Sequence, residues 1–186
     1  MSYFIVGSSK GLLSGGIPPL TNLLYVGVTL LIFFLMWIEF GLEKLRGWFK
    51  SQNLLRSIFL GVFLSVITSF VMVIDNLLYV EKPVKLGSAL LAINIIVAVL
   101  LGPVIEELVY RGVIIDILGR WFRGFVCVTA SALIFSLVHI PEGFIDFLLV
   151  FLVGICFGVV YIIDGNLIPS TIAHSLSNVA VLIFIK

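Results

Sequence analysis

Long apolar stretches separated by short polar ones dominate the chain. A membrane-spanning helix needs about 20 mostly apolar residues, and the pattern predicts six such helices. They are expected at Thr21–Ile38, Ser57–Val80, Ala89–Leu118, Phe125–Ile140, Phe147–Ile163 and Ile168–Ile185. Gly102-Pro103 interrupts the third stretch, and because proline removes a helix hydrogen bond, a break there would give seven spans. The pattern therefore predicts an all-α polytopic transmembrane bundle with an intramembrane polar site, in a single domain, 1–186.

The composition excludes several classes of protein. Of the 186 residues, 61% are hydrophobic and only 11% are charged, and the mean hydropathy is +1.28. Soluble domains have about 25% charged residues, so a soluble enzyme, a disordered chain and a nucleic-acid-binding protein are all excluded. The two cysteines, Cys127 and Cys156, both lie in apolar runs, and their position argues against a disulfide framework.

The distribution of basic residues predicts how the chain is oriented, because Lys and Arg are enriched in cytoplasmic loops. With six spans, one side of the membrane holds six of them, namely Lys44, Arg46, Lys50, Arg56, Arg120 and Arg123. The other side holds Lys10, Lys82, Lys85 and Lys186. We therefore expect 39–56 to be a cytoplasmic loop and both termini to lie outside. A seventh span would move the C-terminus to the opposite side.

Three charged residues, Glu106, Glu107 and Arg111, lie within the third apolar stretch. Each charge near the middle of a bilayer costs about 2.5–3.5 kcal/mol on insertion scales, so we expect these groups to be paired, near water, or facing the bundle interior. Glu107 and Arg111 are four residues apart with the acid first, the favourable order for an ion pair on one helix face. Glu106 points about 100° away, which leaves its carboxylate available as a general base.

The only two histidines of the chain also fall in apolar runs. His139 ends the fourth stretch, and His174 lies near the start of the last one, with Asn178 four residues later on the same helix face. Three separate helices thus present polar groups toward what we expect to be one bundle interior. Glu106 would be a base, His139 a second base or water-holding group, and His174 and Asn178 donors for a developing oxyanion.

Together these residues resemble the three motifs of a known family. The motif residues are Glu106-Glu107-x-x-x-Arg111, Phe135-x-x-x-His139 and His174-x-x-x-Asn178. In this order on apolar helices, they are similar to the motifs of the CAAX protease and bacteriocin-processing family. It is also called the Abi family in bacteria, and it includes the Ras-converting endoprotease. The resemblance covers roughly Ala89–Lys186, the motif-bearing core, whereas 1–88 holds a leader and two spans without a motif.

The resemblance implies an intramembrane glutamate-type peptidase that needs no metal and no other cofactor. Glu106 would activate a water with the help of His139, and His174 and Asn178 would stabilise the oxyanion. Glu107 and Arg111 would maintain the shape of the site or contact substrate. The expected location is a bacterial cell membrane, and the expected role is peptide or bacteriocin processing or self-immunity. The expected partners are a peptide or membrane-protein substrate, the lipid bilayer and a sensor or bacteriocin-related protein, but no nucleic acid.

Other interpretations of the same residues stay open. One Glu and two His could ligate zinc, although the sequence has no HExxH pair on one helix. Glu107 and Arg111 could form a purely structural ion pair. The whole protein could be a non-catalytic immunity or sensor-modulating partner, or an ion-coupled transporter, although the inverted repeats of many transporters are missing.

The break at Gly102-Pro103 carries one further expectation. Straight helices would place Glu106 in the middle of the membrane and His139 near one surface. Non-helical backbone at that depth is tolerated where it lines a cavity. We therefore expect a water-filled cavity beside the break, which brings the two residues level.

Overall fold

The computed structural model describes residues 19–79, 95–139, 141 and 143–184, and all of the regular structure among them is helical. The elements are α2 (Pro19–Trp48), α3 (Leu54–Tyr79), η1 (Val97–Leu101), α5 (Gly102–Glu107), η2 (Leu108–Ile115), α6 (Asp116–Leu118), α7 (Gly124–Val138), α8 (Phe144–Asp164) and α9 (Ile168–Phe184). The four elements from η1 to α6 follow one another without a gap and form one long third helix. The predicted all-α class is therefore confirmed, while most of the predicted leader and residues 89–94 of the third stretch lie outside the described residues.

Two segments among the described residues are long and apolar enough to cross a membrane. They are Leu54–Asp75 in α3 and Phe144–Asp164 in α8. The apolar helices Gly124–Val138 and Ile168–Ile183 are shorter; at 1.5 Å per residue they would span less than the roughly 30 Å hydrocarbon core. These helices fit a membrane protein, and the count of six spans stays a prediction.

Helix α2 continues into the stretch that we predict to be a loop. Gly41 adopts φ 74° and ψ 157°, a kink that only glycine reaches easily, and the helix resumes and ends at Trp48. In this second half Leu45 and Trp48 are buried, whereas the side chain of Glu43 is 92% exposed. The segment is an amphipathic helix whose apolar face packs on the protein. The prediction of a loop is thus wrong as far as Trp48, because counting charges does not reveal an apolar face.

The third helix does not break at Gly102-Pro103. Gly102 has ordinary right-handed helical angles, φ −56° and ψ −59°, and Pro103 lies at the start of α5. The preceding turn, η1, is π-helical, with hydrogen bonds to the fifth rather than the fourth residue. Pro103 therefore lies inside a continuous helix, directly after this wider turn. The predicted break and the seventh span that depends on it are wrong, and the predicted cavity stays a prediction.

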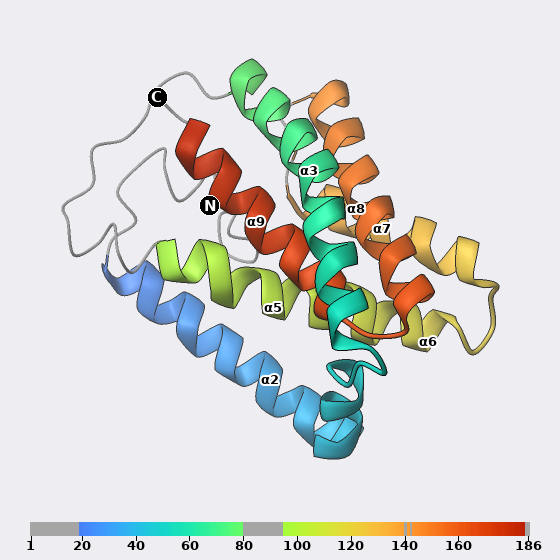
Figure 1. Cartoon of the computed structure of the whole chain (residues 1–186). Helices are drawn as coiled ribbons and strands as arrows, with labels where there is room; N and C mark the ends of the chain where they lie inside the picture. Colours follow the sequence, from blue (N-terminus) through green and yellow to red (C-terminus); the bar gives the residue numbers. More distant parts are fainter. Residues whose placement is uncertain (1–18, 80–94, 140, 142, 185–186) are drawn as a thin grey trace.

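Small residues let the helices approach closely. A Cβ atom on Gly61 of α3 would lie 2.8 Å from the Cβ of Ile172 in α9. Further along the same two helices, Thr68 and Ser177 share a buried hydroxyl hydrogen bond of 2.7 Å. α3 and α9 are the most extensively packed pair of helices and run side by side in Figure 1. The motif-free α3 thus fixes the position of the last motif-bearing helix.

Glycines also join α7 to α8 and α2 to the third helix. Gly154 and Gly158 of α8 face α7, since a Cβ on Gly158 would lie 2.8 Å from Val128. The ring of Trp48 lies 3.2 Å from the position of a Cβ on Gly112. The backbone carbonyl of Trp48 also accepts a hydrogen bond of 2.7 Å from the N–H of Leu167. The amphipathic half of α2 is therefore tied both to the third helix and to the turn before α9.

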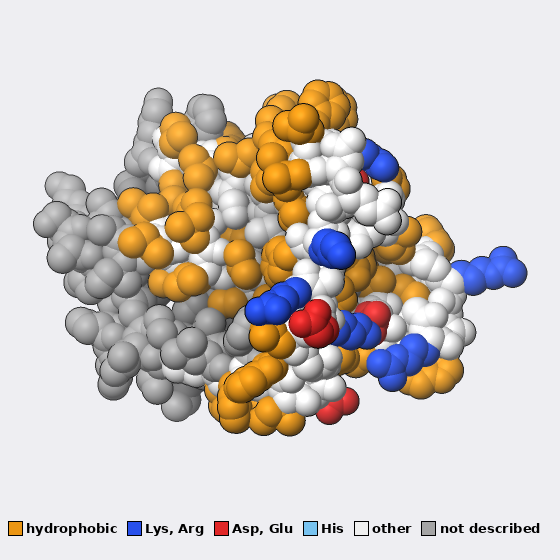
Figure 2. Space-filling view, turned by 60° about the horizontal axis from the view of Figure 1, so that its bottom comes forward, with side chains coloured by type: hydrophobic (Ala, Val, Ile, Leu, Met, Phe, Trp, Pro, Cys, Tyr) orange, Lys and Arg blue, Asp and Glu red, His pale blue; other side chains and the backbone are white. Residues whose placement is uncertain are grey.

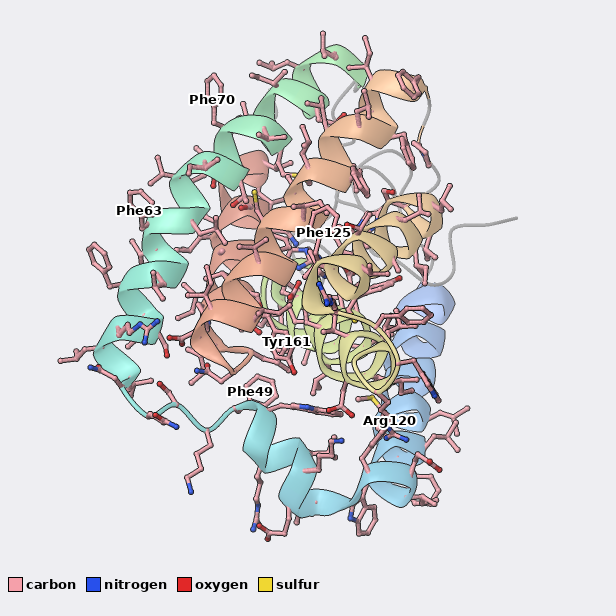
Figure 3. All side chains as sticks on the ribbon, turned by 90° about the vertical axis from the view of Figure 1, so that its right-hand side faces the viewer. Phe49, Phe63, Phe70, Arg120, Phe125 and Tyr161 are labelled. Carbon is pink, nitrogen blue, oxygen red and sulfur yellow. The ribbon has the colours of Figure 1, made fainter. Side chains whose placement is uncertain are left out.

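The outside of the molecule is largely apolar. Phe63 and Phe70 of α3 are 60% and 69% exposed and point outward in Figure 3. Soluble monomers rarely expose apolar patches of more than a few hundred Å², so this exterior suits a lipid environment. Figure 2 shows Lys and Arg side chains gathered on one face. Asp116 contacts Lys44 at 2.6 Å and Arg120 at 3.9 Å, which places the two basic segments at the same end of the bundle.

Candidate active site

The third helix carries three buried charged groups at the centre of the bundle. Glu106 and Glu107 end α5, and Arg111 lies one turn later in η2. The side chains of Glu107 and Arg111 have no exposed surface, and that of Glu106 is 8% exposed. The Nη1 of Arg111 donates to Oε1 of Glu107 at 3.1 Å. The ion pair that the four-residue spacing predicts is therefore present.

Arg111 connects three helices. Its Nη2 donates to the backbone carbonyl of Gly154 in α8 at 3.0 Å. Its guanidinium carbon lies 4.6 Å from the ring centre of Phe135 in α7 and 5.3 Å from that of Phe157 in α8. Such cation–π contacts are strongest when they are shielded from water. The ring centre of Tyr110 lies 5.8 Å away as well. The guanidinium thus has a carboxylate, a carbonyl and three aromatic rings around it, which is how a buried arginine is stabilised.

His174 of α9 lies between the two glutamates. Its Nδ1 is 3.1 Å from Oε1 of Glu107, and its Nε2 is 3.7 Å from Oε2 of Glu106. The ring is stacked on Phe157, with centres 5.0 Å apart and planes 23° apart. Glu107 therefore lies beside Nδ1 of the His174 ring, and Glu106 lies beside its Nε2.

His139 follows the last residue of α7 and approaches Glu106 from another side. Its Nδ1 is 2.7 Å from the backbone carbonyl of Phe135. Because a carbonyl only accepts hydrogen bonds, Nδ1 must carry the proton. The other nitrogen, Nε2, is 3.8 Å from Oε2 of Glu106. The continuous third helix thus brings Glu106 and His139 together without the break that we predict at Gly102-Pro103.

Asn178 makes a different contact from the other motif residues. Its Nδ2 donates to the backbone carbonyl of Ala98 in η1 at 2.7 Å. It lies one helical turn after His174 in α9, on the same face. The structure therefore brings Glu106, His139 and His174 together, with Glu107 and Arg111 behind them, while Asn178 ties α9 to the π-helical turn before Pro103.

Three polar side-chain atoms lie close together at the centre of the site. They are Oε2 of Glu106 and the Nε2 atoms of His139 and His174. The Oε2 atom is 3.7–3.8 Å from the Nε2 atoms of both histidines, slightly too long for a direct hydrogen bond. Among the described residues, this oxygen is buried and has no hydrogen-bond partner. Polar atoms at such separations are commonly bridged by one water molecule. The arrangement is suited to holding and deprotonating a water.

Two contributors to the site are not predicted from the sequence. Phe157 supports His174 and Arg111, and the carbonyl of Gly154 binds Arg111. A backbone carbonyl that accepts a hydrogen bond cannot be recognised from the sequence. Phe157, however, lies three residues after Gly154 on the face of α8 that packs inward. That spacing is the one signal that could have pointed to it.

Comparison with known proteins gives one finding. A family model described as "Type II CAAX prenyl endopeptidase Rce1-like" matches residues 88–180, half of the chain. The matched segment contains every residue of the cluster around Glu106. Searches among curated proteins and among solved structures each found no significant match. Within the described part of the chain, no three or more His, Cys, Asp or Glu side chains are grouped so that they could hold a metal ion.

Proposed function

The chain belongs to the Rce1-like family of type II CAAX prenyl endopeptidases, and from this membership we propose that it is an intramembrane peptidase that hydrolyses a peptide bond near the membrane surface. The observation that carries the proposal is the buried carboxylate of Glu106, which faces the Nε2 atoms of two histidines from two other helices. Peptide hydrolysis by an activated water requires a base close enough to take a proton from that water. Glu106 can be this base, and the two histidines from the other helices can help to hold the water.

In the proposed reaction, Oε2 of Glu106 takes a proton from the water as the water oxygen attacks the carbonyl carbon of the substrate. Nε2 of His139 accepts a hydrogen bond from the second water proton and so orients the attack. The tetrahedral intermediate then breaks its C–N bond, and the proton removed by Glu106 passes to the leaving nitrogen. This sequence needs no metal ion, and we propose a metal-independent mechanism.

The oxyanion of this intermediate needs donors, and we assign them to His174 and Asn178. A side-chain amide has two N–H groups. Asn178 uses one of them on Ala98, which leaves the second for the substrate oxygen. Donors held in a buried site stabilise a developing oxyanion by about 2.7–4 kcal/mol each.

We further propose that the substrate is a peptide or a membrane protein, and that the role is bacterial peptide or bacteriocin processing or self-immunity. A non-catalytic immunity or sensor-modulating protein is the second candidate. It is favoured by the contacts of Arg111 with Gly154 and of Asn178 with Ala98, which make these motif residues part of the helix packing.

One comparison separates the two candidates. Cells would express the wild type, Glu106→Gln or Glu43→Gln at equal levels, and new protein termini would be identified by mass spectrometry. Glu43→Gln is the matched control, because the side chain of Glu43 is 92% exposed. A peptidase generates termini with the wild type and the control and none with Glu106→Gln. A cellular effect that is the same for all three proteins, without new termini, would instead establish the non-catalytic role.

A further inference from the structure

We propose that Glu107 is a positioning residue for His174, which keeps the ring proton on Nδ1 so that Nε2 faces Glu106 and the reacting atoms. The inference rests on the proposed peptidase function. It assigns Glu107 a role in the reaction itself, beyond its ion pair with Arg111.

The first step of the argument is the direction of one hydrogen bond. Oε1 of Glu107 is 3.1 Å from Nη1 of Arg111 and 3.1 Å from Nδ1 of His174. A carboxylate beside a buried guanidinium is ionised, and an ionised carboxylate only accepts hydrogen bonds. The proton between Glu107 and His174 therefore sits on Nδ1. In a neutral ring, this leaves a lone pair on Nε2, 3.7 Å from Oε2 of Glu106.

The second step is that Glu107 has no freedom to turn away. Its partner Arg111 is held by the carbonyl of Gly154 and by the faces of Phe135 and Phe157. Neither side chain of the ion pair has any exposed surface, so solvent does not compete for the carboxylate. The orientation of His174 is thus determined by a cross-link between the third helix and α8.

The third step is that the aromatic rings fix the plane of the imidazole. Phe157 stacks on one face of His174, with centres 5.0 Å apart, and Phe135 meets the ring edge-on at 5.9 Å. Since the plane of the ring is fixed, what remains to be determined is its tautomer, that is, which nitrogen carries the proton. Glu107 determines the tautomer.

The two histidines consequently differ in the group that accepts their Nδ1–H hydrogen bond. Nδ1 of His139 donates to the neutral carbonyl of Phe135, whereas Nδ1 of His174 donates to a carboxylate. A carboxylate on Nδ1 stabilises the doubly protonated ring, as the aspartate does in hydrolytic Ser-His-Asp triads. Of the two rings, only His174 therefore has a carboxylate on Nδ1 that can pair with an imidazolium formed during the proposed reaction.

In the neutral ring Nε2 has no proton, yet stabilising an oxyanion requires an N–H donor. An extra proton on Nε2, gained during the reaction, supplies this donor. Oε2 of Glu106 removes a proton from the attacking water and passes it to Nε2 of His174. The resulting imidazolium donates Nε2–H to the oxyanion while Nδ1–H stays on Glu107. When the C–N bond breaks, the same proton moves to the leaving nitrogen, and the ring returns to its Nδ1–H form.

Nitrogen-15 NMR of histidine-labelled protein tests the inference directly, because the chain has only two histidines. Protonated and unprotonated ring nitrogens give separate signals, and His139→Gln assigns them to one residue or the other. We expect Nδ1 of His174 to be protonated in the wild type and in Glu43→Gln. In Glu107→Gln/Arg111→Met, whose amide is free of Arg111 and can donate to Nδ1, we expect that nitrogen to lose its proton wholly or in part, with His139 unchanged.

The double variant is used because in Glu107→Gln alone Arg111 would hold the amide oxygen toward Nδ1, and the charge of Arg111 would lack a carboxylate. Glu107→Gln/Arg111→Met removes both charges, so neither side chain is left as an unpaired buried charge. A proton on Nε2 rather than Nδ1 of wild-type His174, or a His174 signal that is the same with and without the carboxylate, would overturn the inference.

Activity provides an independent readout. We expect Glu107→Gln to lower kcat by about 10²–10⁴-fold, the upper figure being the loss in hydrolytic triads whose aspartate is changed to an amide. If the wild type cleaves nothing while the NMR result is as expected, the peptidase proposal fails and the positioning of His174 by Glu107 stands. If the wild type cleaves and Glu107→Gln cleaves equally well, the positioning role is refuted and the peptidase proposal stands.

Discussion

Arg111→Met tests how much the buried ion pair contributes to stability. Methionine fills a volume close to that of the arginine stem, but it removes the charge and the donor to the carbonyl of Gly154. Removing one partner of a buried ion pair costs about 3–5 kcal/mol, and an unsatisfied backbone acceptor adds about 1–3 kcal/mol. His174 still donates to Glu107 in this variant and offsets part of the loss. We expect the free energy of unfolding to fall by about 4 kcal/mol.

The double variant Glu107→Gln/Arg111→Met leaves no buried charge without a partner. We therefore expect its loss to be smaller than the sum of the two single losses by at least about 2 kcal/mol. Unfolding by a denaturing detergent, followed through the fluorescence of buried Trp48, measures all four proteins in one lipid–detergent mixture. Losses that add to within about 0.5 kcal/mol would mean that the two side chains are not coupled, which contradicts the reasoning.

Three other substitutions and one treatment have expected outcomes. Gly61→Ala places a methyl group 2.8 Å from Cβ of Ile172 and 2.9 Å from the carbonyl of Pro169; it should lower the free energy of unfolding by about 1–3 kcal/mol. Gly47→Ala, with no atom within 4 Å of the added carbon, should be neutral or stabilising in the same assay. Glu106→Asp withdraws the carboxylate by more than 1 Å and should lower kcat by about 10²-fold or more, with the unfolding curve unchanged; equal turnover of a cleaved peptide would exclude Glu106 as the base. Dialysis against a chelator should leave that turnover unchanged, and a loss that zinc restores would replace the metal-independent mechanism with a zinc-dependent one.

The sequence predicts the fold class and much of the site, because both depend on local spacing. Apolar stretches of helical length predict the helices, and the four-residue interval from Glu107 to Arg111 predicts their ion pair. The meeting of Glu106, His139 and His174 follows from rare polar groups in apolar helices, which must find an interior. The family that the motifs resemble is confirmed by the match over residues 88–180.

The features that the sequence does not predict depend on backbone geometry or on distant contacts. Gly102-Pro103 has the pattern of a break, but a π-helical turn just before it keeps the helix continuous. The polar stretch after Glu39 has the composition of a loop, but it is helical to Trp48, whose ring packs on Gly112 of the third helix. Glu107 also binds His174, because α9 packs against the third helix. The periodicity of apolar residues within a helix does not predict which helices pack together.

The packing of α3 against α9 also bears on the order in which the protein is assembled. Ribosomes make the N-terminal helices first, so α3 is synthesised before the segment that carries His174 and Asn178. Gly61 and Thr68 of α3 are therefore made before Ile172 and Ser177, the α9 residues that they contact. The active centre contains His174 of α9, so it is complete only when the C-terminal helix has packed against α3.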